Sequence, residues 1–200
     1  SETVRDTSWT RNSEFKLYRM SEKQLEKFNP DVFGLMESKL IRNHKGLVSY
    51  YKHKKGNAHS AVYDFNTVDI IPIDLIAPNS IDIVVTSPPY GDSRTTVAYG
   101  QFSRLSNQWL GIDKANHIDK RLMGGVRYND ITSFGIPILD DVISRIQCKD
   151  SKRVNDVISF YVDYQRSISN VAAVVKPCGY ACYVVGNRRV KGEFIETDEI

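Results

Sequence analysis

Two consecutive prolines flanked by hydroxyl-bearing residues are the part of this sequence best suited to chemistry. The run Thr-Ser-Pro-Pro-Tyr covers residues 86–90 and directly follows Ile81–Val85, which is nearly all β-branched. Such a composition is typical of a strand buried on both faces of a sheet. Proline cannot donate to a strand ladder, so the strand must end at Pro88. The sequence therefore predicts a rigid polar loop at the carboxyl end of a strand, where open α/β sheets bind their ligands.

The elements around this loop follow the order strand, helix, strand. Apolar residues recur at helical spacing over 151–175, and the pattern stops at Pro177. A second apolar run, Tyr180–Val185, begins after Gly179 and ends at Gly186. This order predicts an α/β fold in which mainly parallel strands are flanked by helices.

The N-terminal part is expected to be helical and to end near residue 58. Asn29 with Pro30 gives a helix start signal, and an apolar stripe follows over 33–51. We take 1–58 as a helical segment and 59–200 as the catalytic part, with a short strand at 61–65 and a helix at 99–111. Residues 112–150 look irregular and are long for a connector, so they are a candidate target-recognition insertion.

The proline run resembles motif IV of the S-adenosylmethionine-dependent DNA amino-methyltransferases, which has Asp, Asn or Ser before Pro-Pro and Tyr or Phe. The segments 99–111, 151–180 and 185–189 also resemble the parts that follow this motif, so the resemblance covers about residues 60–200. The resemblance implies a partial Rossmann-like methyltransferase sheet. It also implies an enzyme that acts on a base in double-stranded DNA. Serine at the first motif position is most typical of enzymes that methylate N4 of cytosine. Adenine N6, or a base in RNA, is the alternative target.

The resemblance gives each residue of the turn a role. An exocyclic amino nitrogen is a poor nucleophile, because its lone pair is delocalised into the ring, and acceptors aimed at its N–H groups draw it toward tetrahedral geometry. Ser87 would supply one acceptor and the Pro88 carbonyl the other, in a turn that Pro88 and Pro89 keep rigid. Tyr90 would stack on the flipped base. A stiff turn without any catalytic role is the alternative interpretation.

Further residues are expected near the cofactor and the DNA. Asp64 stands where the family has an acid that accepts from the adenine amino group of the cofactor, although an aspartate that caps a turn is equally consistent. Thr86 and Asn187, each near a strand end, are the other expected cofactor contacts. The basic residues expected to contact DNA are Arg94, Arg188, Arg189 and Lys191. Solvated surface charge is the alternative interpretation of these residues.

The glycine-rich cofactor loop of the family is not found, because the chain contains no Gly-x-Gly. We therefore expect a fragment or one subunit of a split enzyme, with that loop supplied by a second chain or a missing segment. A non-catalytic subunit that binds DNA or a partner is the alternative from another class.

Composition sets broader limits. The 200 residues carry a net charge of +3, which permits nucleic-acid binding without arguing for it. The sequence shows no apolar run of membrane-spanning length and no signal-peptide pattern, so a cytoplasmic location without a membrane partner is expected. The 4 histidines and 3 cysteines lack metal-ligand spacing. Cys178 follows a proline, as the nucleophile of cytosine-C5 enzymes does, but a turn cysteine fits its place after a helix better.

Overall fold

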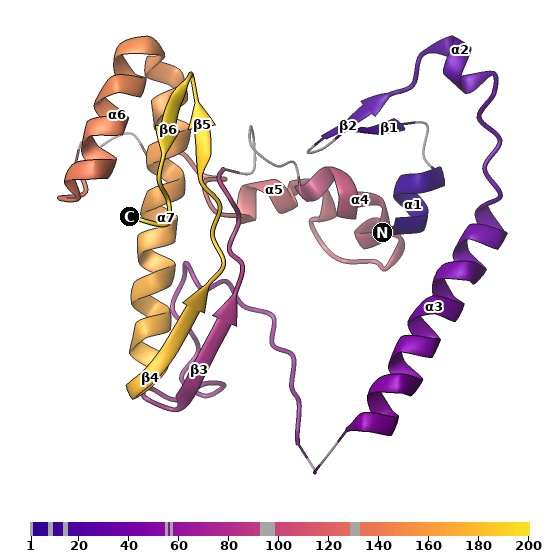
Figure 1. Cartoon of the computed structure of the whole chain (residues 1–200), viewed down its shortest axis with the longest axis horizontal. Helices are drawn as coiled ribbons and strands as arrows, with labels where there is room; N and C mark the ends of the chain where they lie inside the picture. Colours follow the sequence, from indigo (N-terminus) through magenta and orange to yellow (C-terminus); the bar gives the residue numbers. More distant parts are fainter. Residues whose placement is uncertain are drawn as a thin grey trace. The chain divides into compact units, whose positions relative to one another are not determined.

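The computed structural model describes residues 2–7, 10–13, 16–54, 56, 58–92, 99–128 and 133–200. The chain divides into two compact units, shown in Figure 1: Ser1–Val62 with Gly100–Asn116, and Tyr63–Tyr99 with His117–Ile200. The first division falls near the boundary expected at residue 59. Residues 100–116, however, group with the N-terminal unit.

The first unit is mainly helical. A capping box formed by Ser21 and Gln24 opens α2. The cap of α3 is Asp31, whose carboxylate accepts from the Gly34 N–H at 2.9 Å, so Asn29 is not the cap. The elements of this unit are α1 (Glu2–Thr7), β1 (Thr10–Ser13), β2 (Lys16–Arg19), α2 (Glu22–Leu25), α3 (Val32–His53), most of α4 (Tyr99–Trp109) and most of the 3-10 turn η1 (Ala115–His117).

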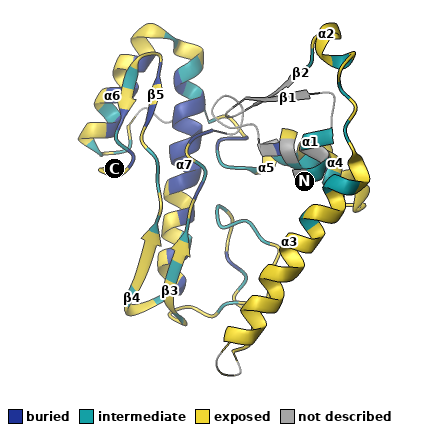
Figure 2. Cartoon of the chain, turned by 45° about the vertical axis from the view of Figure 1, so that its right-hand side comes forward, coloured by how far each residue is buried: buried dark blue, intermediate teal, exposed yellow. Residues whose placement is uncertain are grey.

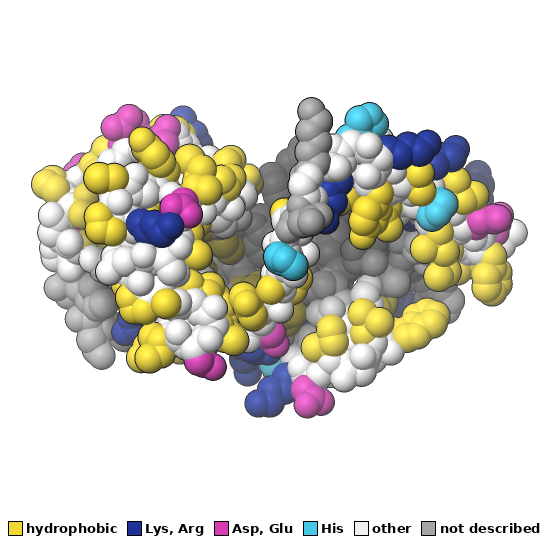
Figure 3. Space-filling view, turned by 90° about the horizontal axis from the view of Figure 1, so that it is seen from below, with side chains coloured by type: hydrophobic (Ala, Val, Ile, Leu, Met, Phe, Trp, Pro, Cys, Tyr) yellow, Lys and Arg dark blue, Asp and Glu magenta, His cyan; other side chains and the backbone are white. Residues whose placement is uncertain are grey.

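Helix α3 leaves its apolar stripe open. No residue of α3 is buried, and Phe33 and Leu40 lie among its exposed hydrophobic residues. Figure 2 shows the helix coloured as exposed along most of its length. Figure 3, a view from below, shows hydrophobic side chains open to solvent on both units.

Two parallel strands and one long helix form the frame of the second unit. β3 (Ile81–Thr86) pairs in parallel with β4 (Val175–Tyr183), and α7 (Ser151–Val174) leads directly into β4. Val171 and Val174 of α7 pack against Val84 and Tyr183 on one face of this pair. This parallel pair agrees with the predicted α/β class, and the strand at 81–85 is confirmed. The expectation of mainly parallel strands is not met in the described residues, because the other two strand pairs are antiparallel.

The other face of the pair is exposed. Alternate strand residues point to opposite faces, and Val85 and Tyr180, each 71% exposed, lie opposite the face that α7 covers. The expectation that this strand is buried on both faces is therefore wrong for the part of the chain described here. Within the described residues of the second unit, only the α7 side of the pair has a covering element (Figure 2).

A second layer corrects the expectation for residues 112–150. The 13-residue helix α6 (Pro137–Lys149) buries Leu139, Val142, Ile143 and Ile146 against α7 and the C-terminal hairpin. The sequence predicts an irregular segment here, because Gly135 and Pro137 interrupt regular patterns. Proline at the first helical position is equally a helix start. The hairpin consists of β5 (Arg188–Val190) and β6 (Glu193–Ile195), and α5 (Ile118–Arg121) completes the unit. Residues 61–65, expected as a strand, have no regular structure.

Candidate active site

The Ser-Pro-Pro-Tyr turn lies at the carboxyl edge of the parallel pair, as the sequence predicts. β3 ends at Thr86, which pairs with Tyr183, and the Val184 N–H donates to the Thr86 carbonyl at 2.8 Å. The chain then leaves the ladder at Ser87, because Pro88 and Pro89 cannot donate to a neighbouring strand. Parallel pairing brings the ends of β3 and β4 to the same edge.

The turn faces its prolines inward and its hydroxyl groups outward. Pro88 is buried and Pro89 half-buried, whereas Ser87 is exposed and Tyr90 is 42% exposed. The Ser87 Oγ lies 3.0 Å from the Tyr90 hydroxyl oxygen, so these two groups share a hydrogen bond. A hydrogen-bonding oxygen and part of an aromatic ring are therefore available to a ligand at this edge.

Gly186 sets how closely the chain approaches the Tyr90 ring. A Cβ at residue 186 would lie 3.3 Å from both Cγ and Cδ1 of Tyr90. The backbone that follows β4 therefore supports one part of the ring, while another part remains open.

Asp92, two residues beyond Tyr90, was not singled out by the sequence. Its carboxylate is 0% exposed and lies 3.1 Å from Arg153 Nη2 and 3.5 Å from Arg188 Nη1. A single aspartate after a motif gives no sequence signal of its own. The unusual feature is structural, because a carboxylate is rarely fully buried unless it is paired.

The structure separates the basic residues that were expected at DNA. Arg188 is 8% exposed and pairs with Asp92, so its guanidinium is not presented to a phosphate. Arg189 is exposed and lies over the Phe194 ring, and Lys191 is bound to Asp150 at 2.8 Å. Arg94 lies outside the described residues. Of the four, Arg189 and Lys191 are on the surface of the hairpin.

The residues expected at the cofactor lie near the ends of elements. Thr86 is half-buried at the end of β3, and Asn187 is exposed just past β4, where its side-chain oxygen accepts from the Asp198 N–H at 3.3 Å. Asp64 is exposed in the irregular segment that precedes β3. These groups are hydrogen-bond acceptors, which suits an amino group on a cofactor.

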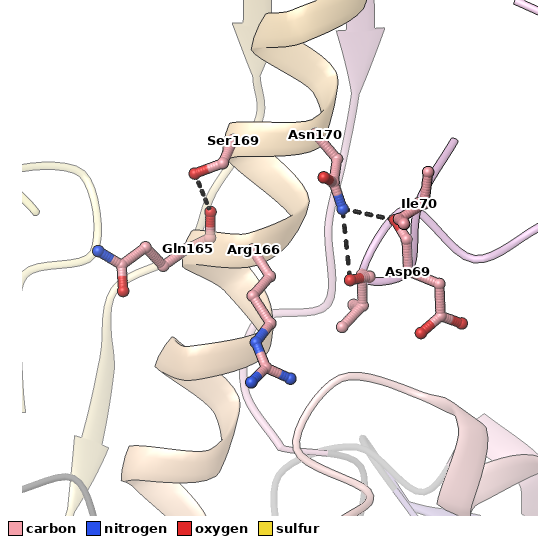
Figure 4. A pocket seen from close by; sticks show the side chains of 7 residues that line it. Asp69, Ile70, Gln165, Arg166, Ser169 and Asn170 are labelled. Carbon is pink, nitrogen blue, oxygen red and sulfur yellow. Dashed lines mark hydrogen bonds between the residues drawn. The ribbon is translucent and has the colours of Figure 1, made fainter. Parts of the chain in front are cut away.

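An open hollow of about 760 Å³ lies apart from the turn, between α7 and residues 68–70. In Figure 4 the Asn170 amide reaches across it and donates to the carbonyl oxygens of Val68, at 3.3 Å, and of Asp69. No residue of the Ser-Pro-Pro-Tyr turn lines this hollow. The polar groups there join α7 to the segment before β3, which is a structural role.

The described ranges contain neither a membrane-spanning helix nor a metal site. None of the helices there has the length and apolar character needed to cross a bilayer. The same residues contain no group of three or more His, Cys, Asp or Glu side chains that would hold a metal ion.

These features define an α/β chain with a proline-locked polar turn at the carboxyl end of a parallel strand. The chain is 42% identical, over 213 aligned residues, to the Type II methyltransferase M.MvaI of Kocuria varians. The alignment includes the whole chain but 47% of the relative, so the chain spans about half the length of the relative it matches. No family model matches the chain, and no solved structure matches it significantly. The name of this relative gives its class, a methyltransferase, and no target base.

Proposed function

We propose that this chain is the catalytic part of a DNA methyltransferase that moves a methyl group from S-adenosylmethionine to N4 of a flipped cytosine. The observation that carries this proposal is the outward presentation of Ser87 and Tyr90 by a buried proline turn at the carboxyl edge of β3. Similarity to a Type II methyltransferase along the whole chain supports the enzyme class. Serine at the first motif position favours cytosine over adenine.

The turn acts on the amino group of the base. Ser87 Oγ and the Pro88 carbonyl accept its two N–H groups, and this interaction strengthens as the nitrogen becomes tetrahedral. The Tyr90 ring stacks on the base, which offsets part of the few kcal/mol, roughly, that unstacking costs. Holding the nitrogen in line with the donor can supply up to about 7–11 kcal/mol of the rate acceleration.

S-adenosylmethionine, when bound, supplies the methyl group as an electrophile. Within this chain, we propose that Asp64, Thr86 and Asn187 accept hydrogen bonds from its polar groups; Asp64 and Asn187 are exposed. These residues would hold only one part of the cofactor, because the chain has no Gly-x-Gly loop to hold the rest. We propose that a further segment or a second chain supplies that loop.

The β5–β6 hairpin is the proposed DNA contact in the described part of the chain. Arg189 and Lys191 are exposed on it, within a few residues of the end of β4. We propose that they bind phosphates, together with Arg94. Contacts of this kind position a duplex but do not read its sequence.

Analysis of nucleosides tests the proposal. The full protein, with any partner chain, is incubated with DNA and S-adenosylmethionine, and the digested DNA is examined by mass spectrometry. We expect N4-methylcytosine, which is lost in Ser87→Ala and kept in Ser80→Ala. Ser80 is the matched control, because its hydroxyl donates to the Ala77 carbonyl in a turn at the opposite end of β3.

The other outcomes identify the alternatives. N6-methyladenine in the DNA, or a methylated base in RNA, would keep the chemistry and change the target. If wild-type protein methylates neither nucleic acid, the proposal is overturned in favour of a non-catalytic subunit. The missing glycine loop is the observation that favours this last alternative.

A further inference from the structure

The segments after β3 and β4 remain connected beyond the end of their ladder. Val184 bonds to Thr86, the backbone at Gly186 supports the Tyr90 ring, and Arg188 pairs with Asp92. These three contacts follow one another along both segments. The catalytic turn is therefore attached at its start, at its tyrosine and at its far end.

The far attachment is a buried ionic cluster. Arg188 and Arg153 both approach the same oxygen of Asp92, Oδ2, and their side chains are 7% and 15% exposed. Gly124 closes over the aspartate, because a Cβ there would lie 3.0 Å from the Asp92 Cβ. The carboxylate is thus enclosed by groups from three separate parts of the second unit.

Both arginines are themselves held in place. The Arg188 guanidinium lies over the rings of Phe160, 5.0 Å from the centroid, and Tyr161, at 5.9 Å. Arg153, near the start of α7, also pairs with Asp156 at 3.2 Å. Asp92 is therefore bound to the most buried helix of the unit rather than to a mobile surface charge.

We propose that Asp92, Arg153 and Arg188 form a clamp that fixes the Ser87–Tyr90 turn in its catalytic position; this rests on the proposed function. A buried ion pair is often no more stable than an apolar replacement, so stability alone is a weak reason to keep one. The clamp instead holds the turn to one geometry. Displacement of a reacting group by about 1 Å can cost roughly 100-fold in rate.

The decisive comparison is Asp92→Asn against Asp140→Asn in the full protein. Asp140 also accepts several hydrogen bonds, from the Ser133 hydroxyl and from the N–H groups of Phe134 and Gly135, but these partners belong neither to the turn nor to the clamp. We expect both substitutions to lower the midpoint of thermal unfolding. Asp92→Asn should lower kcat by about 10- to 100-fold with little change in KM for DNA, whereas Asp140→Asn should keep the kcat of the wild type.

A second pair keeps the proposal testable if Asp92→Asn fails to fold. Gly186→Ala adds one methyl group against the Tyr90 ring, while Gly46→Ala adds it where no atom lies within 4 Å. We expect a loss of kcat for Gly186→Ala alone, with the emission of 2-aminopurine at the target position reporting altered stacking by Tyr90.

The outcomes separate the clamp from the function. Wild-type kcat in both Asp92→Asn and Gly186→Ala would overturn the clamp and leave the methyltransferase intact. The clamp would also be overturned if, in all four variants, the loss of kcat were proportional to the drop in the unfolding midpoint. A wild-type protein that methylates nothing would instead overturn the proposed function.

Discussion

The Tyr90 hydroxyl is bound to the oxygen that we propose as the acceptor for the target base. Its distance of 3.0 Å from Ser87 Oγ means that one hydrogen-bonding position of the serine is already used. A hydroxyl oxygen has two lone pairs, so the base can share Ser87 with Tyr90 or displace it. The ring and the hydroxyl of Tyr90 therefore have separate roles.

Replacement of Tyr90 distinguishes these roles. Tyr90→Phe keeps the stacking ring, so we expect DNA binding and flipping of the base to be preserved with a modest change in kcat. Tyr90→Ala removes a stack worth about 1–3 kcal/mol, which is about 5- to 150-fold in the population of the flipped base. Emission of 2-aminopurine at the target position measures this population. Equal impairment of both variants would contradict a stacking role.

Individual residues also show where inference from the sequence reaches its limit. Ser87 and Tyr90 lie at the predicted strand end and face solvent, because a proline pair after a β-branched strand leaves few alternatives. Arg188 was expected on the surface with its neighbour Arg189, yet it is buried over two aromatic rings. Nothing in the local sequence shows that Asp92 is available to neutralise it, since the two lie almost a hundred residues apart.

At the scale of elements, β4 itself contains a residue in an unfavourable conformation. Cys178 has φ of +65°, where the register between β3 and β4 shifts. A side chain costs about 1–2 kcal/mol in this region, and glycine avoids most of that cost. We expect Cys178→Gly to raise the free energy of unfolding by about 1 kcal/mol.

The neighbouring position provides the control for this substitution. A Cβ at Gly179 would lie 2.7 Å from Val175 Cγ1 and 2.9 Å from the Asp82 carbonyl oxygen. Gly179→Ala should therefore destabilise the protein, as measured by chemical denaturation. A loss of stability in Cys178→Gly would show that the left-handed conformation of residue 178 is not strained.

The start of α7 should be sensitive to acid. Asp150 caps the helix through the N–H groups of Lys152 and Arg153, and the hydrogen bond from Lys191 does most to lower its pKa, from 3.8 to about 2. A carboxyl group whose pKa falls on folding stabilises the protein above its unfolded pKa, and this stability is lost as the pH falls through the folded pKa. The relevant window is therefore between pH 4 and pH 2.

The substitution Asp150→Asn keeps a side-chain oxygen that caps the helix but removes the negative charge. We expect the unfolding midpoint of Asp150→Asn to fall less steeply than that of the wild type over this window. Lys191→Met should have the same effect, because it removes the partner. An identical pH dependence in all three proteins would contradict the account.

The elements were predictable where one physical signal dominated. The β-branched run of β3 and the long periodicity of α7 are of this kind, since each pattern fits one element. Helix α6 was missed because Pro137 fits both a turn and a first helical residue, and the burial that decides between them comes from α7. The short segment 61–65 has the composition of a strand but no partner among the described residues.

At the scale of the whole molecule, the open face of the β3–β4 pair is the main unexplained feature. Parallel sheets are almost always covered on both faces, yet Ile83, Val85 and Tyr180 are exposed. The relative is about twice as long as this chain. An open sheet face and an absent glycine loop agree with our proposal that further polypeptide takes part in the reaction.

The affinity for the cofactor tests that proposal. We expect the 200-residue chain alone to bind S-adenosylmethionine weakly or not at all in calorimetry, because it contains no Gly-x-Gly loop. Addition of the segment or partner that carries such a loop should restore saturable binding. Tight binding by the isolated chain would contradict the need for a second contributor.

Photochemical cross-linking of the target base tests the central claim most directly. DNA with 5-iodocytosine at the methylated position is irradiated in complex with the full protein, and the attached peptide is identified by mass spectrometry. We predict attachment at Tyr90, with little in Tyr90→Ala. Attachment only to residues remote from 87–90, from a complex that still methylates DNA, would contradict the account.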